Sequence, residues 1–325
     1  MHLDHTLAAS SLASFDVLTY DADLLISPFS DLQFIAKCAA LQPDAIVLSS
    51  WSDAPRHPTI QAIRFVRSEL SIPVAAIWWD TCSEAFWIGL APRMDEMDVH
   101  VVVDNPSLQF MNLRDPYFNR ILVLWPPQDE TLFKPGAARD IPVSFLGQAS
   151  SYRSYRKEVI DYLLGLKIPG HYSTQERGSQ VTHEVYASLM GRSKISINLS
   201  YSVSCHQLKS RVLEAMLSGA LLFESENEQT SKLFTPMKDY VQFSSKEDLA
   251  VKIVYYLEHE NELKEIAEHG RASAMNQFNS SRFWQLMLAK LNDSVPSSLG
   301  SMASEKHPVQ PVAGKLRTIG KVSGH

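Results

Sequence analysis

The sequence predicts an α/β protein with two successive parallel sheets, and three observations support this fold class. Short apolar and β-branched runs alternate with helical patterns along most of the chain, as parallel sheets require. A proline-rich stretch, Trp125–Pro142, divides that alternation into two series. In the second series a helical pattern ends at Gly219, directly before the apolar run Ala220–Phe223, which predicts a helix leading into a buried strand.

The first series predicts five strands and four helices. The strands are expected at Asp16–Tyr20, Ala45–Ser49, Val74–Trp78, Val99–Val103 and Arg120–Leu124. The helices are expected at about Ser30–Leu41, Pro58–Glu69, Glu84–Asp95 and Ser107–Leu113, with prolines at several of the joins. This is half of a doubly wound architecture.

The second series predicts another sheet, followed by helices and a tail. Its strands are expected at Val143–Leu146, Pro169–Tyr172, Ile195–Leu199, Ala220–Phe223 and Tyr240–Phe243. Its helices are expected at Arg153–Leu164, Thr182–Gly191, His206–Ser218, Gln229–Phe234 and Lys246–Glu258, with continuous helical character from Asn261 to about Leu291. From Asp293 onward the chain lacks periodicity and is rich in Ser, Gly, Pro and Lys, which predicts a disordered tail.

The length and charge of the chain limit what the protein can be. Its 325 residues are enough for two domains of about 150 residues with substantial cores. Hydrophobic residues make up 45% and charged residues 20%, as in an ordinary globular protein. The net charge of −6 and the pI of about 6.0 argue against nucleic acid as a partner, so an anionic ligand must be held by local arginines.

The cysteines and the apolar runs bear on localisation. Cys38, Cys82 and Cys205 are odd in number, far apart and without the spacing of a zinc site. We therefore expect reduced thiols in a cytoplasmic protein, with no bound metal. The first fifteen residues do not form a secretion signal, and no later run reaches the roughly 18 apolar residues that span a bilayer. We expect no transmembrane segment, while peripheral membrane contact stays open.

The helix before Gly219 carries the clearest candidate ligand groups. Arg211 and Glu214 lie one turn apart on a polar stripe, beside an apolar face. The guanidinium of Arg211 suits a phosphate, and the carboxylate of Glu214 suits ribose hydroxyls. Helices of open α/β sheets present their first turns to the crevice where ligands bind. The alternative interpretation is an ion pair between the two side chains on the protein surface.

Other polar residues follow predicted strands of the second series. Arg153 and Arg156 come after the loop at Gly147, where positive charge near a helix N-terminus indicates an anion site. Two solvated arginines are the alternative. Ser200, in the segment after the strand that ends at Leu199, would bring a hydroxyl and backbone N–H groups to the same crevice.

Asp80 is the main candidate in the first series. It follows Trp78 and Trp79 at the carboxyl end of a predicted strand, where α/β enzymes place ligand contacts. The alternative is an aspartate that caps the next helix or turn. Weaker candidates of the same kind are Asp53, His57 and Asp104.

Several motifs together resemble a known family. The segment R-V-L-E-A-M-L-S-G-A-L-L-F, which begins at Arg211, resembles the R-x-x-E-A core of the "glycosyl transferases group 1" domain. Upstream, Val143–Gly147 followed by two arginines resembles the opening of that domain, and Leu263–Arg271 resembles one of its later helices. The likeness covers about residues 143–285. In the first series, Trp78-Trp79-Asp80 resembles a motif of the CgeB-like branch of the family.

The resemblance implies a GT-B fold, with two Rossmann-like domains and an interdomain cleft. The implied domains are a short acceptor domain at 1–138, a domain at 139–292 that binds a nucleotide sugar and ends in a helix that crosses back onto the first domain, and a tail at 293–325. Many relatives carry a second glutamate eight positions before the one that matches Glu214, and His206 occupies its place here. The implied site therefore has Asp80 and His206 as catalytic candidates. Its donor-binding candidates are Gly147, Arg153, Arg156, Ser200, Arg211 and Glu214.

The resemblance further implies a glycosyltransferase that moves a sugar from a nucleotide-diphosphate donor to a glycan, lipid or small-molecule acceptor. It implies no metal and no separate cofactor, and it suggests retention of anomeric configuration. Two alternatives stay open. One is a protein of this fold that binds a nucleotide or sugar without catalysis, and the other is a sugar epimerase of the same fold.

Overall fold

The computed structural model describes residues 3–17, 27–49, 57–79, 81, 95–103, 119–125, 127–149, 154–173, 181–200 and 208–294. These residues belong to two compact units. The C-terminal unit comprises the described residues from 127 to 279, and the N-terminal unit combines the described residues before 127 with residues 280–294. The division lies after Pro126, compared with residue 138 in the prediction from the sequence. The last helix, which was expected to cross back onto the first domain, belongs to the N-terminal unit.

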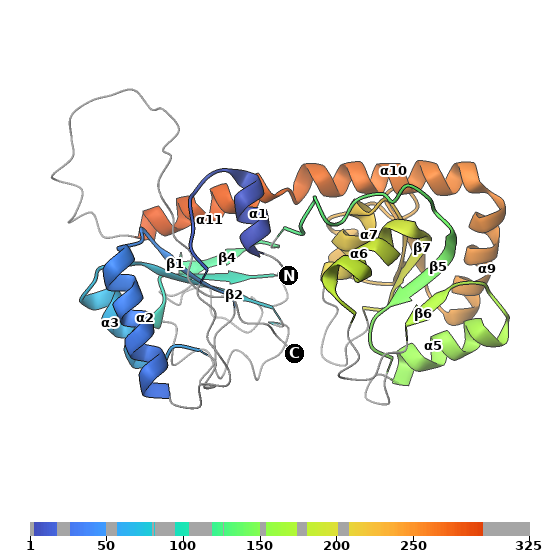
Figure 1. The fold of residues 1–325 in the computed structure, drawn as a ribbon. Coiled ribbons are helices and arrows are strands. Elements are labelled where there is room, and N and C mark those ends of the chain that lie inside the picture. Colours follow the sequence, from blue (N-terminus) through green and yellow to red (C-terminus); the bar gives the residue numbers. More distant parts are fainter. Residues whose placement is uncertain are drawn as a thin grey trace, which may run out of the picture. The chain divides into compact units, whose positions relative to one another are not determined.

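The N-terminal unit contains a parallel sheet, which has four strands among the described residues (Figure 1). They are β1 (Ile46–Ser49), β2 (Val74–Trp78), β3 (Val99–Val102) and β4 (Ile121–Val123), and they lie side by side in that order. Ile46 pairs with Val74, and Ala75 pairs with Val99. The strands are almost continuously apolar because side chains from both faces are buried.

Two pairs of helices cover the two faces of this sheet. They are α2 (Ser27–Leu41) with α3 (Ile60–Ser68), and α1 (Leu3–Ser10) with α11 (Ser280–Ser294). Ile46 of β1 packs with the α2–α3 side, while its neighbour Val47 packs with the α1–α11 side. Helices α1 and α11 lie side by side (Figure 1), and Nε1 of Trp284 donates a 3.1 Å hydrogen bond to Oγ1 of Thr6. The two ends of the described chain thus build one layer.

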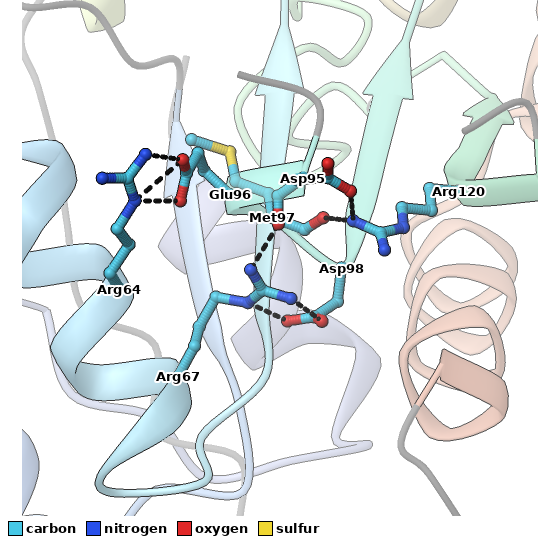
Figure 2. A network of polar contacts seen from close by, with 7 residues as sticks. All are labelled: Arg64, Arg67, Asp95, Glu96, Met97, Asp98 and Arg120. Atoms are coloured by element: carbon cyan, nitrogen blue, oxygen red, sulfur yellow. Dashed lines mark hydrogen bonds and ion pairs between the residues drawn. The ribbon is translucent and has the colours of Figure 1, made fainter. Parts of the chain in front are cut away.

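A network of charged residues holds the amino-terminal edge of the same sheet (Figure 2). The guanidinium of Arg67 donates to both carboxylate oxygens of Asp98, and Oδ2 of Asp98 also accepts from the backbone N–H of Val74, at 2.8 Å. On either side, Arg64 pairs with Glu96 and Arg120 pairs with Asp95. The network links α3 to the starts of β2, β3 and β4. It lies at the edge opposite the one where ligands of α/β folds bind, which assigns it a structural role.

The C-terminal unit contains a second parallel sheet. Its strands are β5 (Ile141–Leu146), β6 (His171–Ser173), β7 (Ser193–Asn198), β8 (Leu221–Ser225) and β9 (Val241–Phe243), in the spatial order β6-β5-β7-β8-β9. The chain leaves β5 on one side to form β6 and then returns to the other side to form β7. The strand order therefore reverses between β5 and β7, and their carboxyl ends form the topological switch point, where open α/β sheets bind ligands.

Helices cover both faces of the second sheet. They are α5 (Ser154–Gly165), α6 (His183–Arg192), α7 (Ser210–Leu217), α8 (Glu228–Ser231), α9 (Lys246–Glu258) and α10 (Glu260–Gln277). Ile195 and Ile197 of β7 pack against α5, α9 and α10. Between them Ser196 faces the other way, where its hydroxyl donates to Sδ of Met190 in α6 at 3.1 Å. Helix α7 contacts α6 and β7, and Arg211 in its first turn bonds to Asn198 at the carboxyl end of β7, so this turn lies at the switch point.

Helix α7 ends as the sequence predicted. Gly219 has φ +68°, a left-handed conformation that residues with a Cβ adopt only with strain. Its N–H donates to the carbonyl of Met216, and the next N–H donates to the carbonyl of Ala215. Arg139 donates to the carbonyl of Ser218 at 2.8 Å, and Arg271 donates to that of Leu217 at 3.1 Å. Two cations thus satisfy the carbonyls at the negative end of the α7 dipole.

Most predicted elements are present, with a few differences. The described part of the expected strand at Asp16–Tyr20, Asp16 and Val17, has no strand pairing, and the rest lies outside the described residues. The expected helices Glu84–Asp95 and Ser107–Leu113 lie almost wholly outside them. The continuous helix expected from Asn261 is instead α10 and α11, which are separated at Phe278 and Asn279. Helix α1 was not predicted.

Candidate functional site

A cavity of about 640 Å³ opens at the switch point of the C-terminal sheet. Residues 146–148, at the carboxyl end of β5, form part of its lining. Ser173 of β6, Tyr186 and Leu189 of α6, and Arg211 and Glu214 of α7 contribute further walls. The cavity therefore has apolar and polar walls, and its volume lies in the range of sites that hold small molecules.

Arg211 is held in a fixed position in this cavity. Its Nη1 donates to Oδ1 of Asn198 at 2.9 Å, and its guanidinium carbon lies 5.5 Å from the centroid of the Phe145 ring. Gly147 leaves room for it, because a Cβ at residue 147 would lie 2.5 Å from Nη2 of Arg211. Nε of Arg211 is buried and has no hydrogen-bond partner within the described part of the chain. Arg211 also lines the cavity, so its guanidinium can meet a ligand there.

Glu214 is buried one turn further along α7. The residue is only 7% exposed, and Oε2 of its carboxylate accepts a 2.7 Å hydrogen bond from the hydroxyl of Tyr186. Burial raises the pKa of Glu214, while the hydrogen bond from Tyr186 and the charge of Arg211 act in the opposite direction. An ion pair on the protein surface, the alternative interpretation of this residue pair, does not fit a carboxylate that is buried against a tyrosine.

Ser200 belongs to a buried polar cluster that is connected to Arg211 through Asn198. The cluster includes a glutamate that the sequence analysis missed. Glu224, at the carboxyl end of β8, is fully buried. Its carboxyl accepts from the hydroxyl of Ser200, from Nδ2 of Asn198 at 2.7 Å and from Nδ2 of Asn227 at 3.2 Å. Burial raises the pKa of Glu224 to about 7. A glutamate that directly follows the apolar run Ala220–Phe223 was the available sign of this buried group.

Arg156 has a different environment from the one expected. It is 6% exposed, and its guanidinium donates to the carbonyl of Leu199 from Nε at 3.2 Å and from Nη2 at 2.9 Å. Nη1 donates to the carbonyl of Gln148 at 3.4 Å. Arg156 therefore joins the segments that follow β5 and β7, and it is not a solvated surface residue. Its contact with an anion stays a prediction.

Several other predicted residues lie outside the described residues. These are Asp80, Arg153 and His206, together with the weaker candidates Asp53 and Asp104. Their roles stay predictions. His57 is described and lies just before α3, in the N-terminal unit.

The described residues offer no preformed site for a metal ion. No three His, Cys, Asp or Glu side chains among them gather in a way that could hold one. Cys38 is buried in the N-terminal unit, and burial raises the pKa of its thiol to about 12, so this thiol stays protonated at neutral pH. Within the described residues no helix is long and apolar enough to cross a bilayer.

Comparison with solved structures shows the GT-B fold. The structure of Alr3699/HepE from Anabaena, determined in complex with UDP-glucose, has a TM-score of 0.57 at 13% identity, and the match covers 81% of this chain and 82% of that one. Sucrose-phosphate synthase from Thermosynechococcus elongatus matches with a TM-score of 0.57 at 12% identity, over 83% of this chain and 79% of that one. A glycosyltransferase from Rickettsia africae matches with a TM-score of 0.54 at 14% identity, over 83% of both chains.

Sequence comparison identifies the family of the C-terminal part of the chain. No curated protein matches the chain. Residues 131–289 match the family described as glycosyl transferase-like, and this range contains Gly147, Arg156, Ser200, Arg211 and Glu214. The match confirms the predicted resemblance, and with it the prediction of an enzyme of this class, while the CgeB-like branch stays a prediction. The protein therefore carries a glycosyl transferase-like domain at residues 131–289, within a chain of GT-B fold.

Proposed function

We propose that the protein is a glycosyltransferase that uses a nucleotide-diphosphate sugar as donor and holds the nucleotide in the cavity of the C-terminal unit. The observation that carries this proposal is the pair of prepared groups on α7. Arg211 is fixed by Asn198, Glu214 is fixed by Tyr186, and both residues line the cavity. One is a cationic fork and the other a carboxylate, and they lie one turn apart in a 640 Å³ cavity.

These groups match the parts of a nucleoside diphosphate. The guanidinium of Arg211 would bind the diphosphate through charge-assisted hydrogen bonds, helped by the N–H groups at the start of α7. Glu214 accepts from Tyr186 and lines the cavity, and a carboxylate has further lone pairs that would accept from the ribose hydroxyls. The apolar walls near Leu146 and Leu189 would lie against the nucleobase.

The same arrangement supports transfer chemistry. As the bond between the anomeric carbon and the diphosphate oxygen breaks, negative charge develops on the leaving diphosphate. Arg211 would stabilise that charge without a metal ion, because its position is already set by Asn198 and Phe145. The acceptor oxygen forms the new bond to the anomeric carbon, and its proton passes to the departing diphosphate oxygen. We propose Asp80 as the group that orients this acceptor, His206 as a group near the donor sugar, and a reaction that retains the anomeric configuration.

A uridine nucleotide is the first donor to test. HepE, whose fold this chain shares, was crystallised with UDP-glucose, UDP and glucose. Calorimetry with UDP-glucose and with the corresponding guanosine, adenosine and thymidine diphosphate sugars would identify the nucleobase. Release of the nucleoside diphosphate in the presence of a panel of glycan, lipid and small-molecule acceptors would then measure transfer.

The outcomes separate the proposal from its alternatives. Binding of a nucleotide sugar together with acceptor-dependent release of the diphosphate supports a glycosyltransferase. Binding without any turnover indicates a non-catalytic binding protein of this fold, and conversion of the donor without an acceptor indicates an epimerase. No binding of any of the four nucleotide sugars would refute the proposal.

A further inference from the structure

Glu224 makes no contribution to the wall of the nucleotide cavity, yet it is connected to Arg211 through a single side chain. Asn198 lies between them. Its Nδ2 donates to Oε2 of Glu224 at 2.7 Å, and its Oδ1 accepts from Nη1 of Arg211 at 2.9 Å. In the parallel register of β7 and β8, Asn198 pairs with Glu224 directly, so the backbone fixes this proximity. Carboxyl, amide and guanidinium thus form one chain of hydrogen bonds.

The carboxylate form of Glu224 determines which way the Asn198 amide faces. A carboxylate only accepts hydrogen bonds, so it requires the N–H₂ end of the amide on its side. The amide oxygen must then face Arg211. Ser200 strengthens this choice, because its hydroxyl donates to Oε1 of Glu224 and its Oγ accepts from Nδ2 of Asn198 at 2.8 Å. All three groups are fully buried, where an amide with the wrong orientation would leave donors facing donors.

Protonation of Glu224 would remove this requirement. The carboxylic acid carries an O–H that needs an acceptor, and the nearby groups are already used as donors to it: Asn198, Ser200 and Asn227. An oxygen for the acid would come from rotation of the Ser200 hydroxyl or from turning the Asn198 amide. The turned amide would present N–H₂ to Arg211 and remove the acceptor that holds the guanidinium. The protonation state of a buried carboxyl therefore reaches the proposed diphosphate site.

We propose that Glu224 is a positioning residue of the donor site, which in its ionised form holds Arg211, through Asn198, in the orientation that binds the diphosphate. The inference rests on the proposed function, because it needs Arg211 to bind an anion. The charged and titratable groups that act on Glu224 are Arg211 from α7 and Tyr240 beside β9. Burial brings the pKa of Glu224 to about 7, so its charge changes within an accessible range of pH.

The test is the affinity for UDP-glucose, measured by calorimetry at pH 6 and pH 8 in the wild type and in Glu224→Gln. UDP-glucose suits this purpose because its diphosphate has no ionisation in that range. The wild type should bind roughly 3- to 10-fold more tightly at pH 8, the effect of one hydrogen-bonded contact. Glu224→Gln should bind more weakly at pH 8 and lose most of this pH dependence. His171 and His183 line the cavity in both proteins, so their contribution to the affinity is common to the two sides of the comparison.

A double-mutant cycle with Arg211→Ala separates positioning from a structural effect. If Glu224 acts through Arg211, Glu224→Gln should change the affinity of the wild type but not that of Arg211→Ala. Equal losses in both backgrounds would overturn the inference. Glu258→Gln, an exposed residue at the end of α9, is the control for removal of one negative charge. If Glu224→Gln does not fold, Asn198→Ala takes its place in the same cycle, with the same expected result.

The proposed function and the inference fail in different ways. Absence of UDP-glucose binding by the wild type at either pH overturns both. Binding that is equal at pH 6 and pH 8, and unchanged in Glu224→Gln, overturns only the positioning role and leaves the donor site in place.

Discussion

Nη1 of Arg211 donates a 2.9 Å hydrogen bond to Oδ1 of Asn198, and this bond joins the first turn of α7 to the carboxyl end of β7. A ligand arginine on a helix would otherwise have several rotamers open to it. Here the guanidinium is confined to one position by three groups: the Asn198 amide, the Phe145 ring and the backbone at Gly147. Affinity for an anion gains when the binding group is ordered in advance.

Arg211→Ala should weaken binding of the nucleotide by about 1.5–3 kcal/mol, or roughly 10- to 150-fold, the worth of hydrogen bonds to a charged group. Calorimetry with UDP measures it. Arg192→Ala is the matched control, since Arg192 forms an exposed ion pair with Asp140 in the same unit and does not line the cavity. An unchanged affinity in Arg211→Ala would show that the diphosphate does not bind to the guanidinium of Arg211.

Gly147→Ala should displace the guanidinium without removing it. The new methyl group would lie 2.5 Å from Nη2 of Arg211, so the side chain must move, and we expect at least about a tenfold loss of nucleotide affinity. Gly165→Ala is the control, because a Cβ there meets no atom within 4 Å. Thermal unfolding should show both variants folded. Equal affinities in the two variants would contradict the close approach of Arg211 to Gly147.

Glu214→Gln should reduce the preference for a ribose over a deoxyribose. The amide keeps one acceptor oxygen, and Tyr186 competes for it, so the 2′-hydroxyl loses its partner. The measurement is the ratio of the affinities for UDP and 2′-deoxy-UDP, which should fall toward one.

Two tyrosine variants test the same contact. Tyr186→Phe should lower the ratio in the same direction, because the hydroxyl that orients Glu214 is gone. Tyr255→Phe, which removes a hydroxyl that contacts Glu262 at the surface, serves as its control. A ratio in Glu214→Gln equal to that of the wild type would place the ribose elsewhere.

Glu224 should also make the stability of the protein depend on pH. Its folded pKa of about 7 is raised from 4.5, so the folded state binds the proton more tightly than the unfolded state. The stability linked to this group is present below about pH 4.5 and is lost as the pH rises to about 7. Relative to Glu224→Gln, the wild type should lose roughly 3 kcal/mol of unfolding free energy over that window, an upper value for one group. Urea unfolding at several pH values measures it, and a flat difference would contradict the raised pKa.

Local patterns were enough to predict much of the fold. Helix α9 was predicted with the bounds observed, because Ser245 caps its start and apolar residues recur on one face. Strand β2 was also predicted with its bounds, since a buried parallel strand is a short apolar run between turn residues. The end of α7 followed from Gly219, the residue that tolerates the left-handed conformation there.

The parts that were missed depend on partners far away in the sequence. Helix α1 has only eight residues, and it is held by Leu7 in the core and by the contact of Thr6 with Trp284. The predicted pair Arg211 and Glu214 lies in the cavity, but the groups that orient them, Asn198 and Tyr186, come from other elements. Spacing along one helix can indicate a ligand group. It cannot indicate which distant side chain holds that group in place.

Helix α11 has a consequence for the order in which the protein is made. The β1–β4 sheet leaves the ribosome early, but one of its apolar faces is covered by Phe283, Trp284, Met287 and Leu291, which are synthesised after the whole C-terminal unit. The C-terminal unit can therefore complete its core while the N-terminal sheet still exposes an apolar surface. A nascent chain that stops at residue 279 would keep the residues that line the cavity of the C-terminal unit and leave that sheet open to aggregation.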